Sequence, residues 1–237
     1  MSAKKELMIV TGASRGIGKG IALHFAKEGM DIMIFGRDAA ALKKTEVEIK
    51  KFGVECEGFV GDVSDEVFVN NSVMKILEKY GKVDHLINNA GTRVFKNVVD
   101  ASLDDFKLQV NANLYGVFNF SRAVLKGMIE RKQGSIINIS SLAGKNAFAT
   151  GAMYAATKHA LMGFTASMFL EVREYNIRVA VICPGSVNTE FFDGLSMKPN
   201  KEKILQVEDI AEAVAAVLKL PIRALISEIE IRPTNPK

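Results

Sequence analysis

The chain has 237 residues, of which 48% are hydrophobic and 24% are charged, so it can bury a sizeable core as one globular domain. Its net charge is only +4, and the lysine-rich stretch at residues 43–51 is interleaved with Glu46 and Glu48, which argues against nucleic-acid binding. No apolar run approaches the roughly 18 residues of a membrane-spanning helix, and residues 1–6 do not have the pattern of a secretory signal. We therefore expect no membrane association.

Short apolar runs alternate with longer amphipathic stretches along the chain. We expect strands at residues 7–10, 32–35, 57–60, 86–88, 135–140, 179–182 and 227–231. We expect helices at residues 16–29, 39–52, 66–80, 103–131, 153–175 and 208–218. Several strand runs are apolar throughout, as in a parallel sheet that helices cover on both faces. The pattern predicts an α/β fold, a single doubly wound Rossmann-type domain over residues 1–237, with seven parallel strands in the order 3-2-1-4-5-6-7.

Irregular segments at residues 91–100, 143–151 and 185–203 each follow an expected strand. In a doubly wound sheet such loops border one ligand crevice. The other signals exclude little: Cys56 and Cys183 are far apart, which favours a reducing, cytoplasmic location over a disulfide scaffold. The three histidines lack metal-ligand spacing, so we expect no metal site.

The first strand runs into TGASRGIG at residues 11–18, where a helix is expected to open. Glycine at Gly12, Gly16 and Gly18 permits a tight turn and lets the backbone approach a pyrophosphate at the helix N-terminus. The turn predicts a dinucleotide site with Ser14, Arg15 and Ile17 in the same loop. The alternative is a glycine-rich turn that binds nothing.

The end of the second strand bears on the choice of cofactor. An NAD site usually offers a carboxylate there to the ribose 2′-hydroxyl, whereas this chain has Gly36 followed by Arg37. A guanidinium can bind the 2′-phosphate, so we expect NADP(H) to be favoured over NAD(H). If the strand extends two residues further, Asp38 becomes the ribose ligand and the preference reverses.

Two further segments fit a cofactor cleft. Asp62 and Val63 follow the third strand and can face the adenine, although Asp62 can equally begin a turn. Asn88 is followed by Asn89, Ala90 and Gly91 after the fourth strand, where small residues let the backbone pass close to a cofactor and the amides brace neighbouring strands.

Tyr154 and Lys158 lie four residues apart in an expected helix and so share one face. Ser141 ends the preceding strand, where its hydroxyl can reach across the crevice. Asn113 lies in the long expected helix, where asparagine is unfavourable, so it is either a buried bracing residue or an interruption of the helix. The alternative for Tyr154 is a buried tyrosine whose hydroxyl bonds the backbone.

Taken together, these motifs resemble the short-chain dehydrogenase/reductase family over essentially the whole chain. The similarity is greatest to the 3-oxoacyl-acyl-carrier-protein reductase type, although the C-terminus, residues 227–233, lacks the glycines of that group. The resemblance implies hydride transfer between NADP(H) and a carbonyl or alcohol. An NAD-linked alcohol dehydrogenase is one alternative, and a non-catalytic NADPH-binding sensor is another.

The resemblance also implies residue roles. Tyr154 would exchange a proton with the substrate oxygen, Lys158 would lower the Tyr154 pKa and bind the nicotinamide ribose, Ser141 would steady the substrate, and Asn113 would position a water. A lysine ammonium at about 5 Å can supply about 3 of the roughly 4 kcal/mol that such a pKa shift requires. Residues expected to border the nicotinamide are Pro184, Gly185, Val187 and Thr189.

The sequence says least about the residues that contact the substrate. We expect Thr92, Arg93, Phe148, Met153, Phe191 and Phe192 to line or cap an apolar pocket for a small to medium carbonyl, with residues 191–195 as a short lid. Arg93 can pair with a substrate anion or lie in solvent. The family resemblance implies a homodimer or homotetramer, with the expected helices 103–131 and 153–175 as the dimer surfaces.

Overall fold

The centre of the molecule is a parallel sheet. In the computed structural model, which describes residues 5–193 and 199–235, seven strands pair in the order β3-β2-β1-β4-β5-β6-β7. The strands are β1 (Leu7–Thr11), β2 (Asp31–Gly36), β3 (Cys56–Val60), β4 (His85–Asn88), β5 (Gly134–Ile139), β6 (Ile177–Pro184) and β7 (Glu228–Ile231). The predicted strand order and all-parallel pairing are therefore confirmed.

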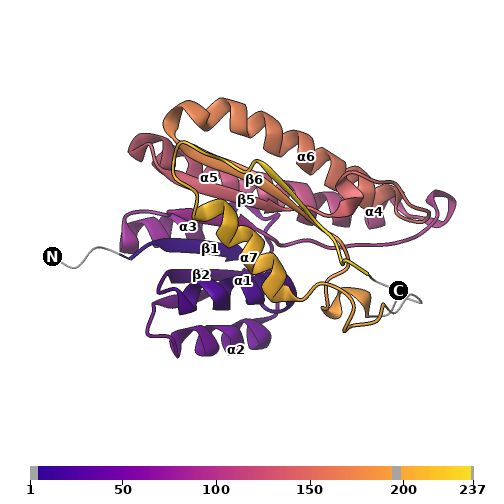
Figure 1. Cartoon of the computed structure of the whole chain (residues 1–237), viewed down its shortest axis with the longest axis horizontal. Helices are drawn as coiled ribbons and strands as arrows, with labels where there is room; N and C mark the ends of the chain where they lie inside the picture. Colours follow the sequence, from indigo (N-terminus) through magenta and orange to yellow (C-terminus); the bar gives the residue numbers. More distant parts are fainter. Residues whose placement is uncertain (1–4, 194–198, 236–237) are drawn as a thin grey trace.

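Helices cover both faces of this sheet (Figure 1). They are α1 (Gly16–Lys27), α2 (Ala39–Lys50), α3 (Glu66–Tyr80), α4 (Leu103–Val110), α5 (Gly116–Arg131), α6 (Ala152–Val172) and α7 (Val207–Leu218). Side chains alternate across β1: Met8 and Val10 pack with α1, α2 and α7, whereas Leu7 and Ile9 pack with α3, α5 and α6. Because both faces are buried, the strand is apolar from Leu7 to Val10.

The long helix expected at residues 103–131 is not continuous. It is divided into α4 and α5 by a π-helical segment, η2 (Asn111–Tyr115). Asn113 lies in this segment and is completely buried. The extra residue in the turn is the physical reason for the difference, since π-bulges redirect side chains and occur frequently at functional sites. Both readings of Asn113 apply at once, because it is buried and it interrupts the helix.

Short 3₁₀ segments lie in the loops that follow strands at the carboxyl edge of the sheet: η1 (Val98–Asp100), η3 (Leu142–Gly144) and η5 (Glu190–Phe192). Another, η4 (Arg173–Tyr175), lies at the opposite edge, before β6. Side chains cap two of the helices that follow loops at the carboxyl edge: Asp38 accepts from Ala41 N at the start of α2, and Ser102 forms a capping box with Asp105 at the start of α4. These caps fix where each site loop ends.

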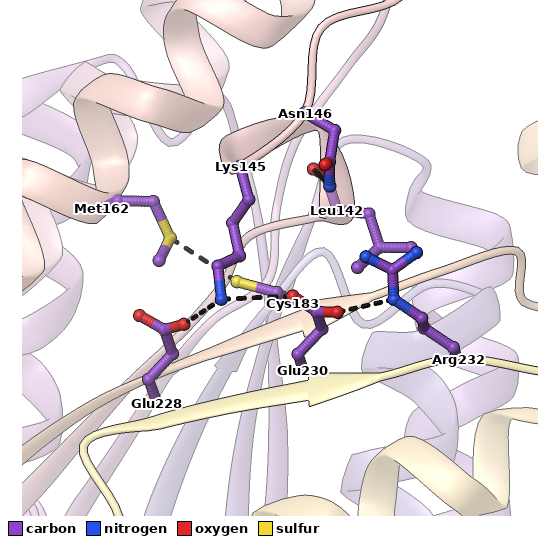
Figure 2. Close-up of polar contacts among 8 residues, drawn as sticks. All are labelled: Leu142, Lys145, Asn146, Met162, Cys183, Glu228, Glu230 and Arg232. Atoms are coloured by element: carbon purple, nitrogen blue, oxygen red, sulfur yellow. Dashed lines mark hydrogen bonds and ion pairs between the residues drawn. The ribbon is translucent and has the colours of Figure 1, made fainter.

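Strand β7 joins the loop after β5 through charged side chains (Figure 2). Lys145, just beyond η3, forms ion pairs with Glu228 and with Glu230 at 3.1 Å, and Glu230 also pairs with Arg232. The opposite face of β7 is apolar and packs on the core. The C-terminal strand therefore holds the loop that follows Ser141 from the outside. Among the residues placed here, no helix is both long and apolar enough to span a bilayer.

Candidate active site

The glycine turn between β1 and α1 leaves room for a ligand only because side chains are absent. Gly12 has φ +66°, and a Cβ there would lie 2.8 Å from the Ala90 Cα. A Cβ on Gly18 would lie 2.4 Å from the Gly12 carbonyl oxygen. The turn is thus closed tightly on itself and on the loop after β4, and no side chain among the described residues caps the first amides of α1, which suits a pyrophosphate site.

The edge of this turn carries a polar group without a partner. Ser14 Oγ is buried and has no hydrogen-bond partner among the described residues. It faces Gly36 at the end of β2, where a Cβ would lie 2.2 Å from it. Arg15 precedes α1 and is exposed, and Ile17 packs against the core. A buried hydroxyl beside an exposed cation fits a ligand that brings hydrogen-bonding oxygens.

Arg37 follows β2 immediately. Its side chain is 66% exposed and lies 3.6 Å from Asp62, a weak ion pair in water. Asp38 caps α2 with its carboxylate. Strand β2 ends at Gly36, so Arg37 rather than Asp38 is the first side chain beyond the strand.

Asp62 and Val63 both have partners within the protein. Asp62 Oδ1 accepts from the Ser64 backbone nitrogen at 2.8 Å and from its hydroxyl at 2.7 Å, which is the turn alternative. Burial would raise the pKa of Asp62, but the Ser64 hydrogen bonds and the Arg37 charge outweigh it and lower that pKa. Val63 is 8% exposed and packs in the core beside Gly116.

Hydrogen bonds join the loop after β4 to the end of β1. Asn89 Nδ2 donates to the Thr11 and Gly12 carbonyls, and the Thr11 hydroxyl accepts from the backbone nitrogens of Asn89 and Ala90. Asn88 Nδ2 donates to Asn138 on β5, so the asparagines brace neighbouring strands as expected. Gly91 comes next, and a Cβ there would lie 2.9 Å from Asn113 Oδ1.

Ser141, Tyr154 and Lys158 meet at the same edge of the sheet. The Ser141 side chain accepts from Ala143 N at 3.1 Å, and its hydroxyl is near enough to the Tyr154 phenol to lower the pKa of that phenol. Lys158 is one helical turn beyond Tyr154, its Nζ lies 5.8 Å from the Tyr154 ring centroid, and it donates to the Ile139 carbonyl at 3.0 Å. Tyr154 is 7% exposed and Lys158 is 5% exposed. A hydroxyl, a phenol and an ammonium are thereby grouped in an environment that is largely buried from solvent.

Burial governs the protonation of this group. It raises the pKa of Tyr154 to about 12, against the lowering effects of the Ser141 hydrogen bond and the Arg93 charge. It lowers the pKa of Lys158 to about 8, although the nearby Cys183 opposes the fall. At neutral pH the phenol therefore holds its proton. The lowered Tyr154 pKa that the family resemblance implies is not the state of the protein alone.

The lowered pKa of Lys158 predicts that the free energy of unfolding depends on pH. Below pH 8 the Lys158 ammonium is charged in both the folded and the unfolded protein, and burial of that charge makes the folded protein less stable. Between pH 8 and 10.5 the unfolded chain binds more protons than the folded one, so stability rises with pH. We expect wild type to gain unfolding free energy relative to Lys158→Met between pH 7.5 and 9.5, measured by urea unfolding. A difference that stays constant with pH would contradict the lowered pKa.

Asn113 connects this group to the loop after β4. Its Oδ1 accepts from Thr92 N at 2.8 Å, and its Nδ2 donates to the Thr92 carbonyl and to Thr157 Oγ1 at 3.0 and 2.9 Å. Thr157 in turn donates to the Tyr154 carbonyl. Asn113 therefore braces the helix that carries Tyr154 and Lys158 against the loop that carries Arg93.

The loop after β6 reaches the glycine turn. Pro184 ends β6, Gly185 N donates to the Ile231 carbonyl, and Val187 is 4% exposed. Thr189 Cγ2 lies close to the turn, since a Cβ on Gly16 would be 3.3 Å away. Because Thr189 Oγ1 also accepts from Phe191 N, the turn and Tyr154 are linked through one short segment. The expected nicotinamide border thus lies between the glycine turn and Tyr154.

Aromatic rings surround Tyr154. Phe95 is the central one, with its centroid 5.6 Å from that of Tyr154, 5.4 Å from Phe148 and 6.3 Å from Phe191. Phe148 and Phe191 were expected on the substrate side, and so was Met153, which is 8% exposed. The side chain of Phe192 and the lid positions Gly194 and Leu195 lie outside what the structure describes.

Sequence reasoning missed Phe95 and the roles of Thr11 and Thr157. Residues 92–95 lie in a segment expected to be irregular, and nothing there indicates that Phe95 turns toward Tyr154. Thr11 opens the glycine-rich motif and Thr157 lies between Tyr154 and Lys158, so a hydroxyl within each motif is the signal that was available.

Comparison with known proteins agrees with this geometry. The model of the short chain dehydrogenase family matches residues 6–200. Sepiapterin reductase of Chlorobaculum tepidum is 32% identical, with 98% of this chain and 97% of the relative covered. A putative ketoacyl reductase of Streptomyces coelicolor is 35% identical, with 90% of each covered.

Solved structures include both cofactor types. An alcohol dehydrogenase from the archaeon Thermococcus sibiricus, complexed with 5-hydroxy-NADP, superposes with a TM-score of 0.89 at 31% identity, over 98% of this chain and 99% of that one. An NAD⁺-bound xylitol dehydrogenase gives a TM-score of 0.88 at 28% identity, over 98% and 100%. This chain belongs to the short-chain dehydrogenase family and is an NAD(P)-dependent oxidoreductase.

Proposed function

We propose that the protein transfers a hydride between NADP(H) and a small to medium carbonyl or alcohol, with Tyr154 as the acid and base. The observation that carries this proposal is the grouping of the Tyr154 phenol with Ser141 and with the buried Lys158 one turn away, at the same sheet edge as the glycine turn. Ser141 is proposed to hold the substrate oxygen beside that phenol. The test is turnover of a panel of ketones and alcohols, followed by nicotinamide absorbance.

The cofactor would lie from the glycine turn to the loop after β6. Residues proposed to hold it are Gly12, Ser14, Arg15, Gly16, Ile17, Gly18, Arg37, Asp62, Val63, Asn89, Ala90, Gly91, Tyr154, Lys158, Pro184, Gly185, Val187 and Thr189. The nicotinamide supplies the hydride. Of these, Asp62 and Val63 have the weakest support, since the first is engaged by Ser64 and the second by the core.

Tyr154 is proposed to work as an acid in the ground state. With a pKa of about 12 its phenol is protonated at neutral pH and can give its proton to a developing alkoxide. Lys158, charged below about pH 8, would stabilise the phenolate that remains. Asn113 is proposed to keep the Lys158 helix in place and, by resemblance, to position a water for proton return.

NADP(H) is proposed as the preferred cofactor on the strength of Arg37 and Ser14. We expect Arg37→Ala to weaken NADPH binding about tenfold and to leave NADH binding nearly unchanged, because only NADPH carries the phosphate that the guanidinium would bind. Isothermal titration of both cofactors measures this. Arg122→Ala is the matched control, since Arg122 is a similarly exposed arginine that is paired with an acid, Glu66, and is not among the residues proposed to hold the cofactor. An unchanged NADPH-to-NADH affinity ratio would remove Arg37 from the site.

Two other candidates stay open to the same assays. Reduction of 3-oxoacyl thioesters is supported by the putative ketoacyl reductase among the relatives. It predicts higher kcat/KM for an acetoacetyl thioester than for a neutral ketone of equal length. A non-catalytic NADPH sensor predicts NADPH binding with no turnover of any panel member.

Self-association is also proposed. Large apolar side chains are exposed on the helices expected to form a dimer: Leu103, Phe106, Leu108, Tyr115, Phe118 and Leu170. Contiguous exposed apolar surface marks interaction sites. We expect wild type to form a dimer or tetramer and Phe118→Glu to shift it toward monomer by light scattering, while an unchanged mass would place the interface elsewhere.

A reducing, cytoplasmic location completes the proposal. Cys56 and Cys183 are buried free thiols. Burial raises their pKa values to about 12 and about 11, so neither forms the reactive thiolate at neutral pH.

A further inference from the structure

Three segments far apart in the sequence contribute phenylalanines to a cluster of rings at Tyr154. Phe95 comes from the loop after β4, Phe148 from the loop after β5, and Phe191 from η5. Phe95 packs edge-on against the other two, with interplanar angles of 85° and 68°, and against Tyr154 at 81°. Edge-to-face rings at these distances attract one another beyond simple area burial. Phe95, Phe191 and Tyr154 therefore form an aromatic cluster, which Phe148 joins through Phe95.

Arg93 contacts two members of this cluster, Phe95 and Phe191. Its Nε donates to the Phe191 carbonyl at 2.8 Å, and its Nη2 donates to the same carbonyl and to the Asp193 carbonyl at 3.1 Å. The guanidinium also lies over the rings of Phe191 and Phe95, at 4.9 and 5.4 Å from their centroids. Among the described residues it forms no ion pair with a carboxylate. Its contacts thus fasten the segment after β6 onto the segment after β4.

The backbone beneath Arg93 is held firmly. Asn113 binds both the nitrogen and the carbonyl of Thr92, and the buried Gln109 donates to the Val94 carbonyl at 3.4 Å. Lys96 N donates to the Thr150 carbonyl in the segment that carries Phe148. The π-helical turn supplies the first of these anchors. Because its backbone is held in this way, the Arg93 side chain can fix the position of the segment that carries Phe191.

We propose that Arg93 is a positioning residue that holds Phe191 over Tyr154 and so restricts the site to neutral carbonyl compounds with a flat apolar group. This rests on the proposed function. Three of the five guanidinium donors are directed to loop carbonyls, so a substrate carboxylate could form paired bonds with Nη2 only by displacing one of them. A flat ring can take the place of one edge-to-face contact, whereas a bulky saturated group cannot make that contact.

Kinetics with two matched ketones test the proposal. Acetophenone and cyclohexyl methyl ketone have the same carbon skeleton and differ in flatness. We expect Arg93→Ala to raise the KM for acetophenone about tenfold, with kcat within about threefold, and to leave the cyclohexyl compound little changed. Phe191→Ala should act alike, and the double variant should be no worse than either single one, because both remove the same contact.

Other kinetic outcomes would overturn it. Additive effects of Arg93→Ala and Phe191→Ala would mean that the two residues act separately. A KM increase confined to ketones that carry a carboxylate, with rescue by Arg93→Lys, would mean that Arg93 binds the substrate anion directly. An unchanged preference between the two ketones would remove Arg93 from specificity.

A fluorescence measurement reports on the same contact without turnover. The chain has no tryptophan, so Phe191→Trp introduces a single reporter at the fastened segment. We expect Arg93→Ala to red-shift its emission and to raise acrylamide quenching about twofold, since the ring loses its cation and its anchor. Phe148→Trp is the control: no contact joins it to Arg93, so its quenching should stay the same.

The two readouts separate the two failures. If the reporter responds as expected but no ketone turns over, the proposed function fails and the Arg93 contact stands. If ketones turn over and the reporter at position 191 does not respond to Arg93→Ala, the contact fails and the proposed function stands.

Discussion

Replacing Tyr154 with phenylalanine is expected to lower kcat by about a thousandfold, within the usual range for loss of a general acid. The variant loses one oxygen, and with it the proton that the substrate oxygen would receive. The ring itself remains, so the aromatic contacts with Phe95 and Phe191 should persist. The Kd for NADPH, measured by fluorescence titration, should change by less than about threefold, because one hydrogen bond is at stake.

Tyr115→Phe is the matched control for this experiment. Tyr115 is 56% exposed and lies at the end of the π-helical segment, so its hydroxyl should not matter for turnover. If Tyr154→Phe retains wild-type kcat, the acid must be another group and the proposed mechanism is wrong. If it loses NADPH affinity in parallel with kcat, the phenol serves binding rather than proton transfer.

Gly18→Ala is expected to weaken NADPH binding by roughly a hundredfold and to lower the unfolding temperature. Alanine is the better helix former, and Gly18 lies inside α1, so propensity alone predicts a gain. Packing predicts the opposite. The new Cβ would lie 2.4 Å from the Gly12 carbonyl oxygen and 2.5 Å from Asn89 Nδ2, and an overpacked site of this kind costs about 1–3 kcal/mol.

Gly163→Ala provides the comparison for that substitution. Gly163 is in α6, and a Cβ there would meet nothing within 4 Å. The same chemical change should therefore raise the unfolding temperature slightly and leave NADPH affinity alone. Calorimetry with and without NADPH measures both variants. Equal behaviour of the two alanines would show that the glycine turn is not closed as tightly as the structure has it.

The strand order and the glycine turn were predictable from sequence because both depend on local chemistry. A strand that is apolar throughout indicates that both of its faces are buried, and the glycines at Gly12 and Gly18 mark positions where a Cβ does not fit. The helix containing Tyr154 and Lys158 was likewise visible as a spacing of four. These signals are carried within a few residues, so no knowledge of distant contacts is needed to read them.

Other features depend on contacts between distant segments. Phe95 faces Tyr154 only because Asn113 and Gln109 fix the loop before it, and neither partner is near it in sequence. The raised pKa of Tyr154 is a consequence of burial, which a consideration of Lys158 alone could not include. Asp62 was read as a possible adenine ligand, and its bonds to Ser64 show how a short local turn can use the same carboxylate.

The π-helical turn at Asn111–Tyr115 has a consequence for the phase of the helices around it. Each residue of an α-helix advances the side-chain direction by about 100°. One additional residue in the turn lets Gln109 and Asn113 face the loop after β4 while Phe120 and Val124 still face the sheet. A regular helix of the same composition could satisfy one of these two faces but not both. The π-bulge therefore rotates the helix before it relative to the helix after it, so that one stretch of chain contributes side chains both to the core and to the candidate site. Deleting one residue there would restore a regular helix, in which these two sets of side chains could not both keep their contacts.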